Sequence, residues 1–263
     1  MNLSSIWHPL KQRPAFWLAA FLVVCLTFIG CSKPAQSASG AQVDSKLKEQ
    51  VLQIIRENPE VILESVQAYQ QRQQDELQKS RQSFLQQLKT NPKAVIGESP
   101  TLGAAAQKIV LIEFSDFQCP YCSRAHNTVN QFMAKHQDQV TLVYKHFPLV
   151  SIHPQAMPAA QAAWAAQQQG KFWEYHNALF EQQKQLSEEL YGAIAKNLNL
   201  DLDKFNRDRN SSAAKTAIQK DMQLGQGLGL EGTPFFILNG ETFSGAVDLS
   251  EMEKIFARVS SKS

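Results

Sequence analysis

The chain has 263 residues, of which 43% are apolar and 19% are charged, an ordinary composition for a globular protein. Its formal net charge is +2, and no basic patch is interleaved with aromatic residues, so the charge pattern does not indicate a nucleic-acid-binding protein. The length allows one sizeable domain together with accessory segments.

The first 31 residues have the pattern of an export signal. Lys11 and Arg13 supply positive charge, and an uncharged apolar run follows over residues 15–29. This run is short for a membrane span and has the length of the apolar core of a signal peptide. Gly30-Cys31 at its end resembles the processing site of a bacterial lipoprotein, which predicts that Cys31 becomes the lipidated first residue.

Two alternatives to lipidation remain open for this segment. The signal is cleaved within residues 35–41, or it stays attached as an uncleaved anchor. All three interpretations place the protein outside the cytoplasm, in the periplasm or the cell envelope, and the lipidated form would be anchored to a membrane.

Two cysteines, Cys119 and Cys122, directly follow an apolar segment at residues 109–114. An apolar strand that leads into Cys-x-x-Cys predicts a pair of thiols at the start of a helix. There the helix dipole and the unpaired backbone N–H groups lower the pKa of a thiol. Structural disulfides in exported proteins usually close longer loops, so the short spacing predicts a redox-active disulfide between Cys119 and Cys122. A zinc half-site is the alternative, but the nearest further ligand, His126, has no companion.

The remaining chain divides into four predicted segments. Residues 32–42 are small and polar and predict a flexible tether. Residues 43–90 have helical periodicity, and their Gln-rich second half predicts a stalk, an oligomerisation segment or a helix laid on the domain. Residues 91–107 are rich in turn-forming residues and predict a linker. Residues 108–262 predict the catalytic domain, in the order strand, helix, strand, helical block, hairpin and closing helix.

Taken together, these features resemble the DsbA family. The motifs that carry the resemblance are Cys119-Pro120-Tyr121-Cys122 after a strand, the segment at residues 145–149, and Gly232-Thr233-Pro234 before a strand. The resemblance covers residues 108–262. It implies an α/β, thioredoxin-like fold with an inserted helical subdomain at about residues 155–228, preceded by an N-terminal helical extension. That extension, with Asn58-Pro59-Glu60 at its centre, is similar to the one in ScsC-like proteins, some of which oligomerise through it.

The resemblance also implies roles for individual residues. Cys119 would be the attacking thiolate and Cys122 the buried resolving thiol. Pro120 and Tyr121 would tune the redox potential, and the neutral Tyr121 stands where strongly oxidising members carry a histidine.

Two further positions complete the predicted site. Pro234 would be the cis-proline that faces the cysteines, and Thr233 would offer its backbone to an extended substrate segment. Glu113 lies in an otherwise apolar strand, where a buried carboxylate could take the proton of Cys122. The alternative for Glu113 is a strand-edge glutamate paired with Lys145.

These features predict an extracytoplasmic thiol:disulfide oxidoreductase. It would need no cofactor, because the cysteine pair itself stores the electrons. Its expected partners are unfolded or misoxidised exported proteins and a membrane redox protein, either a quinone-linked oxidase or a membrane reductant. Two alternatives stay open: an isomerase or reductase that forms homo-oligomers through residues 43–90, and a module that binds Cu(I) through its thiolates.

Overall fold

The computed structural model describes residues 44–261 of the chain, which divides into two compact units, Met1–Leu63 and Glu64–Ser263. The predicted signal, Cys31 and the tether lie outside the described residues. None of the helices in residues 44–261 is long and apolar enough to cross a membrane.

The described part of the first unit consists of α1 (Ser45–Glu57) and the beginning of α2 (Pro59–Thr90). The Asp44 carboxylate caps α1 by accepting a hydrogen bond from Lys46 N at 3.1 Å. Asn58 directly precedes Pro59, the first residue of α2, as the sequence predicts, and it also closes α1. Its side-chain amide donates to Ile54 O at 2.8 Å, and Pro59 then opens α2 at a position where its missing N–H has no consequence.

In the described part of the second unit, five strands form one mixed sheet in the order β1-β3-β2-β4-β5. β2 runs parallel to β3 and antiparallel to β4. The strands are β1 (Thr101–Gly103), β2 (Ile109–Ser115), β3 (Val140–His146), β4 (Phe235–Leu238) and β5 (Glu241–Ser244). The apolar runs that predicted β2, β3 and β4 are buried, as expected for strands covered on both faces.

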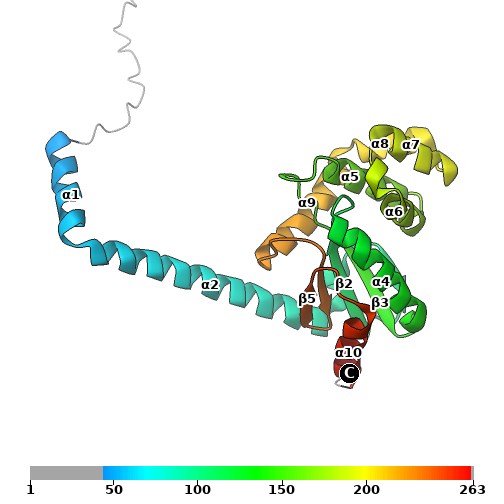
Figure 1. Ribbon diagram of the computed structural model, residues 1–263, viewed down its shortest axis with the longest axis horizontal. Helices are drawn as coiled ribbons and strands as arrows, with labels where there is room; N and C mark the ends of the chain where they lie inside the picture. The colour runs from blue at the N-terminus through cyan, green and yellow to red at the C-terminus, as the bar shows by residue number, and fades with distance from the viewer. Residues whose placement is uncertain (1–43, 262–263) are drawn as a thin grey trace, which may run out of the picture. The chain divides into compact units, whose positions relative to one another are not determined.

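Helices cover both faces of this sheet (Figure 1). Leu111, Leu142 and Phe236 pack against α4 (Pro120–His136) and α10 (Leu249–Ser260). Val110, Ile112 and the other residues of opposite parity pack against the end of α2, α3 (Pro92–Ile96) and the segment that follows α9 (Ser212–Gly227). The Gln-rich half of α2 is therefore laid on the domain at its end, where Phe84 and Leu88 are buried.

The helical insertion lies between β3 and β4 in the chain. Its remaining elements are α5 (Ala156–Gln167), α6 (Phe172–Glu181), the 3₁₀ turn η1 (Gln183–Gln185), α7 (Glu188–Asn197) and α8 (Leu202–Arg209). The buried alanines of α5 allow α6, α8 and α9 to pack closely around it.

The segment at residues 91–107, predicted as a linker, contributes α3 and β1 to the second unit. β1 pairs antiparallel with β3 and forms one edge of the sheet. The sequence hides this strand because it spans three exposed residues, too few to show an alternating apolar pattern.

Candidate active site

The cysteine pair lies at the N-terminus of α4, just after the loop that follows the apolar strand β2. Cys119 occupies the N-cap position of α4. Pro120 is the first residue of the helix, and Cys122 lies in its first turn. Both cysteines are buried free thiols, with exposed fractions of 3% for Cys119 and 0% for Cys122. Local sequence explains the geometry, because proline is favoured at the first position of a helix and needs no N–H partner there.

The two sulfur atoms have opposite acidities. Hydrogen bonding by the Cys122 side chain lowers the pKa of Cys119 to about 5 against the opposing effect of burial. The Thr233 side chain and the backbone N–H groups of Tyr121 and Cys122 act in the same direction as that hydrogen bond. Burial is the main cause that raises the pKa of Cys122 well above its ordinary value, and the neighbouring Cys119 is the next largest cause. At neutral pH the pair therefore combines one thiolate with one protonated thiol.

The loop before β4 faces the cysteines from the other side. The Thr233–Pro234 peptide bond is cis. The Cys119 sulfur lies 3.3 Å from the carbonyl oxygen of Thr233. The structure thus brings together the two motifs that the sequence places more than a hundred residues apart, and it leaves backbone groups of this loop beside the reactive sulfur.

Glu113 is buried in β2, on the strand that leads to the cysteines, with 2% of its surface exposed. Burial raises the pKa of its carboxyl group to about 7, while the neighbouring Ser115 hydroxyl acts in the other direction. The alternative partner, Lys145, follows Tyr144, the residue paired with Glu113, and so projects from the opposite face of the sheet. Lys145 instead forms an ion pair with Asp221, with its Nζ 3.2 Å from Oδ1.

Two residues missing from the sequence prediction lie next to Glu113. Ser115 lies two positions further along β2 and on the same face of the sheet as Glu113. Tyr144 is the register partner of Glu113 on β3. Both side chains are buried, and the Ser115 hydroxyl approaches Glu113, Tyr144 and Cys122 closely enough to affect the pKa of each. The period of two in a strand could have revealed Ser115, whereas Tyr144 depends on strand register, which the sequence does not show.

Polar side chains fasten the loop between β2 and α4. The Asp116 carboxylate accepts hydrogen bonds from Gln118 N at 2.7 Å and Leu149 N at 2.9 Å, and lies 2.7 Å from His153 Nδ1. Gln183 of the insertion donates to the carbonyl oxygens of Phe117 and Cys119, at 2.8 and 2.9 Å. The sequence carries no pattern that would have indicated this role of Gln183.

A groove of about 380 Å³ adjoins Tyr121, the residue before Cys122 in the chain. Tyr121, Arg124 and Thr128 of α4 form one wall, and residues 245–248 form the other. Tyr121 is 53% exposed, and the Arg124 guanidinium lies 4.4 Å from the centre of its ring. The Tyr121 side chain is therefore accessible at the surface.

This arrangement of sheet, helices and cysteines defines the class of the protein as thioredoxin-like with a helical insertion. The chain belongs to the family of the DSBA-like thioredoxin domain, which it matches over residues 110–257. Residues 54–76 also match the N-terminal domain of the copper resistance protein ScsC. The predicted family and the predicted fold class are confirmed.

The chain is also similar to part of longer curated proteins. Na(+)/H(+) antiporter NhaA 3 of Salinispora tropica is 33% identical over 150 residues, which is 57% of this chain and 23% of the antiporter. NhaA 1 of Mycolicibacterium vanbaalenii is 34% identical over 146 residues, 55% of this chain and 24% of that protein. The chain therefore covers about a quarter of the length of these curated relatives.

Solved structures show the same fold. A thioredoxin-like oxidoreductase from Silicibacter pomeroyi superposes with a TM-score of 0.60 at 30% identity, covering 65% of this chain and 99% of that one. ScsC of Proteus mirabilis, in a transitional conformation, gives a TM-score of 0.59 at 23% identity and covers 83% of this chain and 97% of its own.

Proposed function

We propose that this chain is a thiol:disulfide oxidoreductase of the cell envelope, which exchanges disulfides with exported proteins through Cys119 and Cys122. The observation that carries the proposal is the contrast in acidity within the pair. The pKa of Cys119 is lowered to about 5, and that of the buried Cys122 is raised. A thiolate ready to attack, next to a thiol that keeps its proton, is what stepwise disulfide exchange requires.

The exchange conserves atoms and electrons at each step. In the reducing direction, the Cys119 thiolate attacks a substrate disulfide, a mixed disulfide forms and one substrate thiolate leaves. Cys122 then loses its proton and attacks the Cys119 sulfur, forming the Cys119–Cys122 disulfide and releasing the second substrate thiolate. Two electrons pass to the substrate, and the oxidising direction is the reverse of these steps.

Glu113 is the proposed acceptor of the Cys122 proton. Its carboxyl group has a pKa of about 7, and the Ser115 hydroxyl affects the pKa of both Glu113 and Cys122. A group that titrates near neutral pH can take and return a proton without a large energetic cost in either direction. This role applies equally to disulfide formation and disulfide reduction.

The acidity of Cys119 favours the oxidising direction. A stable Cys119 thiolate stabilises the reduced form of the protein, so the disulfide form oxidises substrate thiols more readily. Thiol pKa values of about 7 in thioredoxin and about 3.5 in DsbA accompany potentials of about −270 and about −120 mV. The pKa of about 5 for Cys119 lies between these two thiol pKa values. Pro120 and Tyr121 would tune the potential.

Titration of residues 44–263 in glutathione buffers tests this proposal, with Cys119→Ser as the control. A potential above about −200 mV would support an oxidase that receives its own disulfide from a membrane oxidase. A potential below about −230 mV would instead indicate a reductase or isomerase supplied by a membrane reductant. Absence of any reversible disulfide would overturn the proposal and direct attention to Cu(I) binding by the two thiolates.

The groove beside Tyr121 and the backbone of Thr233 form the proposed substrate surface. An extended substrate segment can pair with the loop that contains Thr233 and Pro234 while its cysteine meets Cys119. The stacked Tyr121 and Arg124 then offer an aromatic and a cationic contact in the groove.

We also propose that Cys31 is lipidated after export and anchors the protein to a membrane. The apolar run and Gly30-Cys31 support this address. Mass spectrometry of the N-terminal peptide from cells tests it: a diacylated Cys31 supports the anchor, whereas an unmodified N-terminus within residues 35–41 would contradict it.

A specific observation favours the isomerase as the second candidate. The helices of the first unit expose Val51, Ile54 and Ile55, and residues 54–76 match the ScsC N-terminal domain. Exposed apolar surface of this kind commonly marks an interface. An oligomer built on α1 would bring several cysteine pairs to one misoxidised substrate.

A further inference from the structure

Three polar side chains near Cys122 are buried and have oxygen atoms without a partner. In the described part of the chain, Oε1 of Glu113, Oγ of Ser115 and the hydroxyl oxygen of Tyr144 make no hydrogen bond. Each of these residues is at most 2% exposed. Unsatisfied hydrogen-bonding groups are costly in a protein interior and rare in native structures, so three of them in one place indicate a function that uses them.

The geometry of β2 explains why these groups lie near Cys122. Glu113 and Ser115 are two positions apart and share a face of the sheet with Leu111, which packs against α4. The backbone N–H of Asp116, the next residue along the strand, donates to the Cys122 sulfur at 3.5 Å. The sulfur is therefore held at the end of β2 beside Ser115, and Glu113 lies about 7 Å further back along the same face.

The Ser115 hydroxyl is placed between the group that loses the proton and the group that receives it. It lowers the pKa of both Glu113 and Cys122, so it lies close to each of them. A hydroxyl can accept a proton at a lone pair while it donates its own proton. Because Ser115 Oγ has no other partner in the described residues, its lone pairs are available for this exchange.

Aromatic rings close this site against bulk water. The ring of Tyr144, the register partner of Glu113, stacks on Phe117 with the centroids 5.4 Å apart and an angle of 21° between the planes. The centroid of Phe172 lies 5.3 Å from that of Tyr144. Cys122 itself is 0% exposed. Its proton therefore has to leave through a neighbouring group of the buried site.

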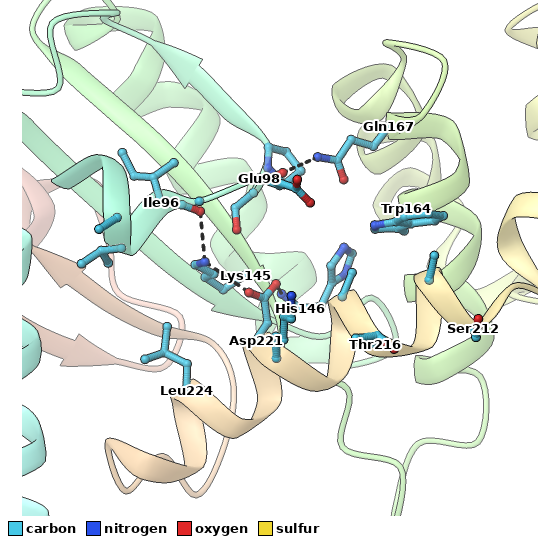
Figure 2. Close-up of a pocket in the computed structure, with 18 residues that line it drawn as sticks. Ile96, Glu98, Lys145, His146, Trp164, Gln167, Ser212, Thr216, Asp221 and Leu224 are labelled. Atoms are coloured by element: carbon cyan, nitrogen blue, oxygen red, sulfur yellow. Dashed lines mark hydrogen bonds and ion pairs between the residues drawn. The ribbon is translucent and has the colours of Figure 1, made fainter. Parts of the chain in front are cut away.

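Two other buried carboxylates of this region are already occupied. The Asp116 carboxylate is contacted by three nitrogen atoms of the neighbouring loops, at 2.7 to 2.9 Å. Asp221 is paired with Lys145, which projects from the opposite face of β3, as Figure 2 shows. Glu113 combines a free oxygen with a place on the face that Cys122 meets.

We propose that Ser115 relays the proton of Cys122 to Glu113 when the mixed disulfide is resolved, a role that rests on the disulfide exchange proposed above. The Cys122 thiol gives its proton to Ser115 Oγ, and the Ser115 hydroxyl gives its own proton to a Glu113 carboxylate oxygen. One S–H bond and one O–H bond break, and two O–H bonds form. The Cys122 thiolate then attacks the Cys119 sulfur, and the substrate sulfur leaves with the electron pair of the broken disulfide.

Exchange with dithiobis(nitrobenzoate) tests this path, because each of the two steps releases one coloured thiolate. The mixed disulfide on Cys119 of the reduced full chain is formed in acidic buffer and resolved after a jump to a series of higher pH values. Ser115→Ala should slow the second release at least about tenfold. It should also move the midpoint of the pH profile upward, because Ser115 lowers the pKa of Glu113. The first release should change less than about twofold.

Ser115→Thr and Ser115→Val are a matched pair, since the two β-branched side chains have nearly the same shape and differ in the hydroxyl. Threonine should restore the second release to within about threefold of the unchanged chain, whereas valine should be as slow as alanine. Equal rates in the threonine and valine variants would overturn the proposal.

The number of protons that move is an independent measure. A relay through a hydroxyl moves two protons, whereas direct transfer from Cys122 to Glu113 moves one. In mixtures of light and heavy water, the rate of the second release should curve with the deuterium fraction in the unchanged chain and become linear in Ser115→Ala. A linear dependence in the unchanged chain, or the same curvature in the variant, would overturn the relay.

The first release separates this proposal from disulfide exchange itself. If Cys119 releases no thiolate, or the second release never follows in the unchanged chain, disulfide exchange fails and the relay fails with it. If both releases occur and Ser115→Ala matches the unchanged chain at every pH, disulfide exchange stands and the relay alone is wrong.

Discussion

The sulfur of Cys119 lies 3.3 Å from the carbonyl oxygen of Thr233, a residue 114 positions further along the chain. The contact joins the start of α4 to the loop before β4, so the reactive sulfur is held by two elements that the sheet brings together. The acidity of the sulfur depends on the same surroundings, because the Cys122 and Thr233 side chains both lower the pKa of Cys119.

The first prediction concerns this acidity. Cys122→Ala removes the largest contribution to the lowered pKa of Cys119, so the thiolate should form at higher pH than in the unchanged chain, whose midpoint should lie at about 5. Ultraviolet absorbance of the thiolate against pH measures both midpoints. Thr233→Val should raise the pH midpoint of thiolate formation by less than Cys122→Ala does, because the Thr233 side chain makes the smaller contribution to the pKa of Cys119. Identical titrations of the Cys122→Ala variant and the unchanged chain would show that the neighbouring thiol does not stabilise the thiolate.

The second prediction concerns the pH dependence of stability at Glu113. Its pKa is raised from 4.5 to about 7, so between these values the folded chain binds more protons than the unfolded chain. Stability should therefore fall as the pH rises from 4.5 through 7, by up to about 3 kcal/mol from this group alone. Glu113→Gln removes the titration and should flatten the decline in urea unfolding measured from pH 5 to pH 8. An equally steep decline in both proteins would show that Glu113 is not the group responsible.

The same substitution should also slow disulfide exchange at the step that uses Cys122. In the unchanged chain the resolution of the mixed disulfide should accelerate as the pH rises through about 7, as the Glu113 carboxylate forms. In Glu113→Gln the rate should be lower by about tenfold or more, and this acceleration should be absent. Stopped-flow measurement of the second step separates it from the attack by Cys119, which should change little.

Elements with strong local patterns were predictable from the sequence, and those that depend on distant partners were not. Cys119 and Cys122 stand at a helix start because an apolar strand and a proline surround them in the chain. Tyr144 joins the site through strand register, and Asp221 reaches Lys145 from a helix 76 positions further along the chain, and neither relation leaves a local signature. A buried lysine signals only that a partner exists, without naming it.

The third prediction follows from that buried ion pair. Asp221→Ala leaves the Lys145 ammonium without its partner and should destabilise the chain by about 3–5 kcal/mol. The double variant Lys145→Met, Asp221→Leu removes both charges and should recover most of that loss, because apolar groups of similar size can replace a buried pair. Urea unfolding of the three proteins at pH 7 measures the difference. A double variant no more stable than Asp221→Ala would show that the hydrogen bonds to Ile96 and His146, rather than charge burial, dominate.

The fourth prediction tests how the end of α2 is held on the domain. Gly229 has a positive φ of 72°, and a Cβ there would lie 2.9 Å from the Leu77 side chain of α2. Gly229→Val should therefore destabilise the chain by about 2 kcal/mol, because a β-branched residue resists this conformation and crowds Leu77. Gly232→Val is the control, since a Cβ there meets nothing within 4 Å and its φ is not in this region. Equal unfolding midpoints for the two variants would show that neither the positive φ of Gly229 nor its contact with Leu77 restricts the side chain at this position.

The final prediction concerns the exposed apolar residues of α1. Val51, Ile54 and Ile55 are 45%, 60% and 40% exposed, which is unusual for side chains whose removal from water is favourable. If α1 forms an interface between copies of the chain, the double variant Val51→Lys, Ile54→Glu should be monomeric in light scattering while residues 44–263 with the natural sequence form an oligomer. The matched control Lys48→Glu changes charge on the same exposed helix without removing apolar surface. An unchanged mass for the double variant would mean that α1 does not assemble the chain, and the isomerase would then lose the observation that favours it.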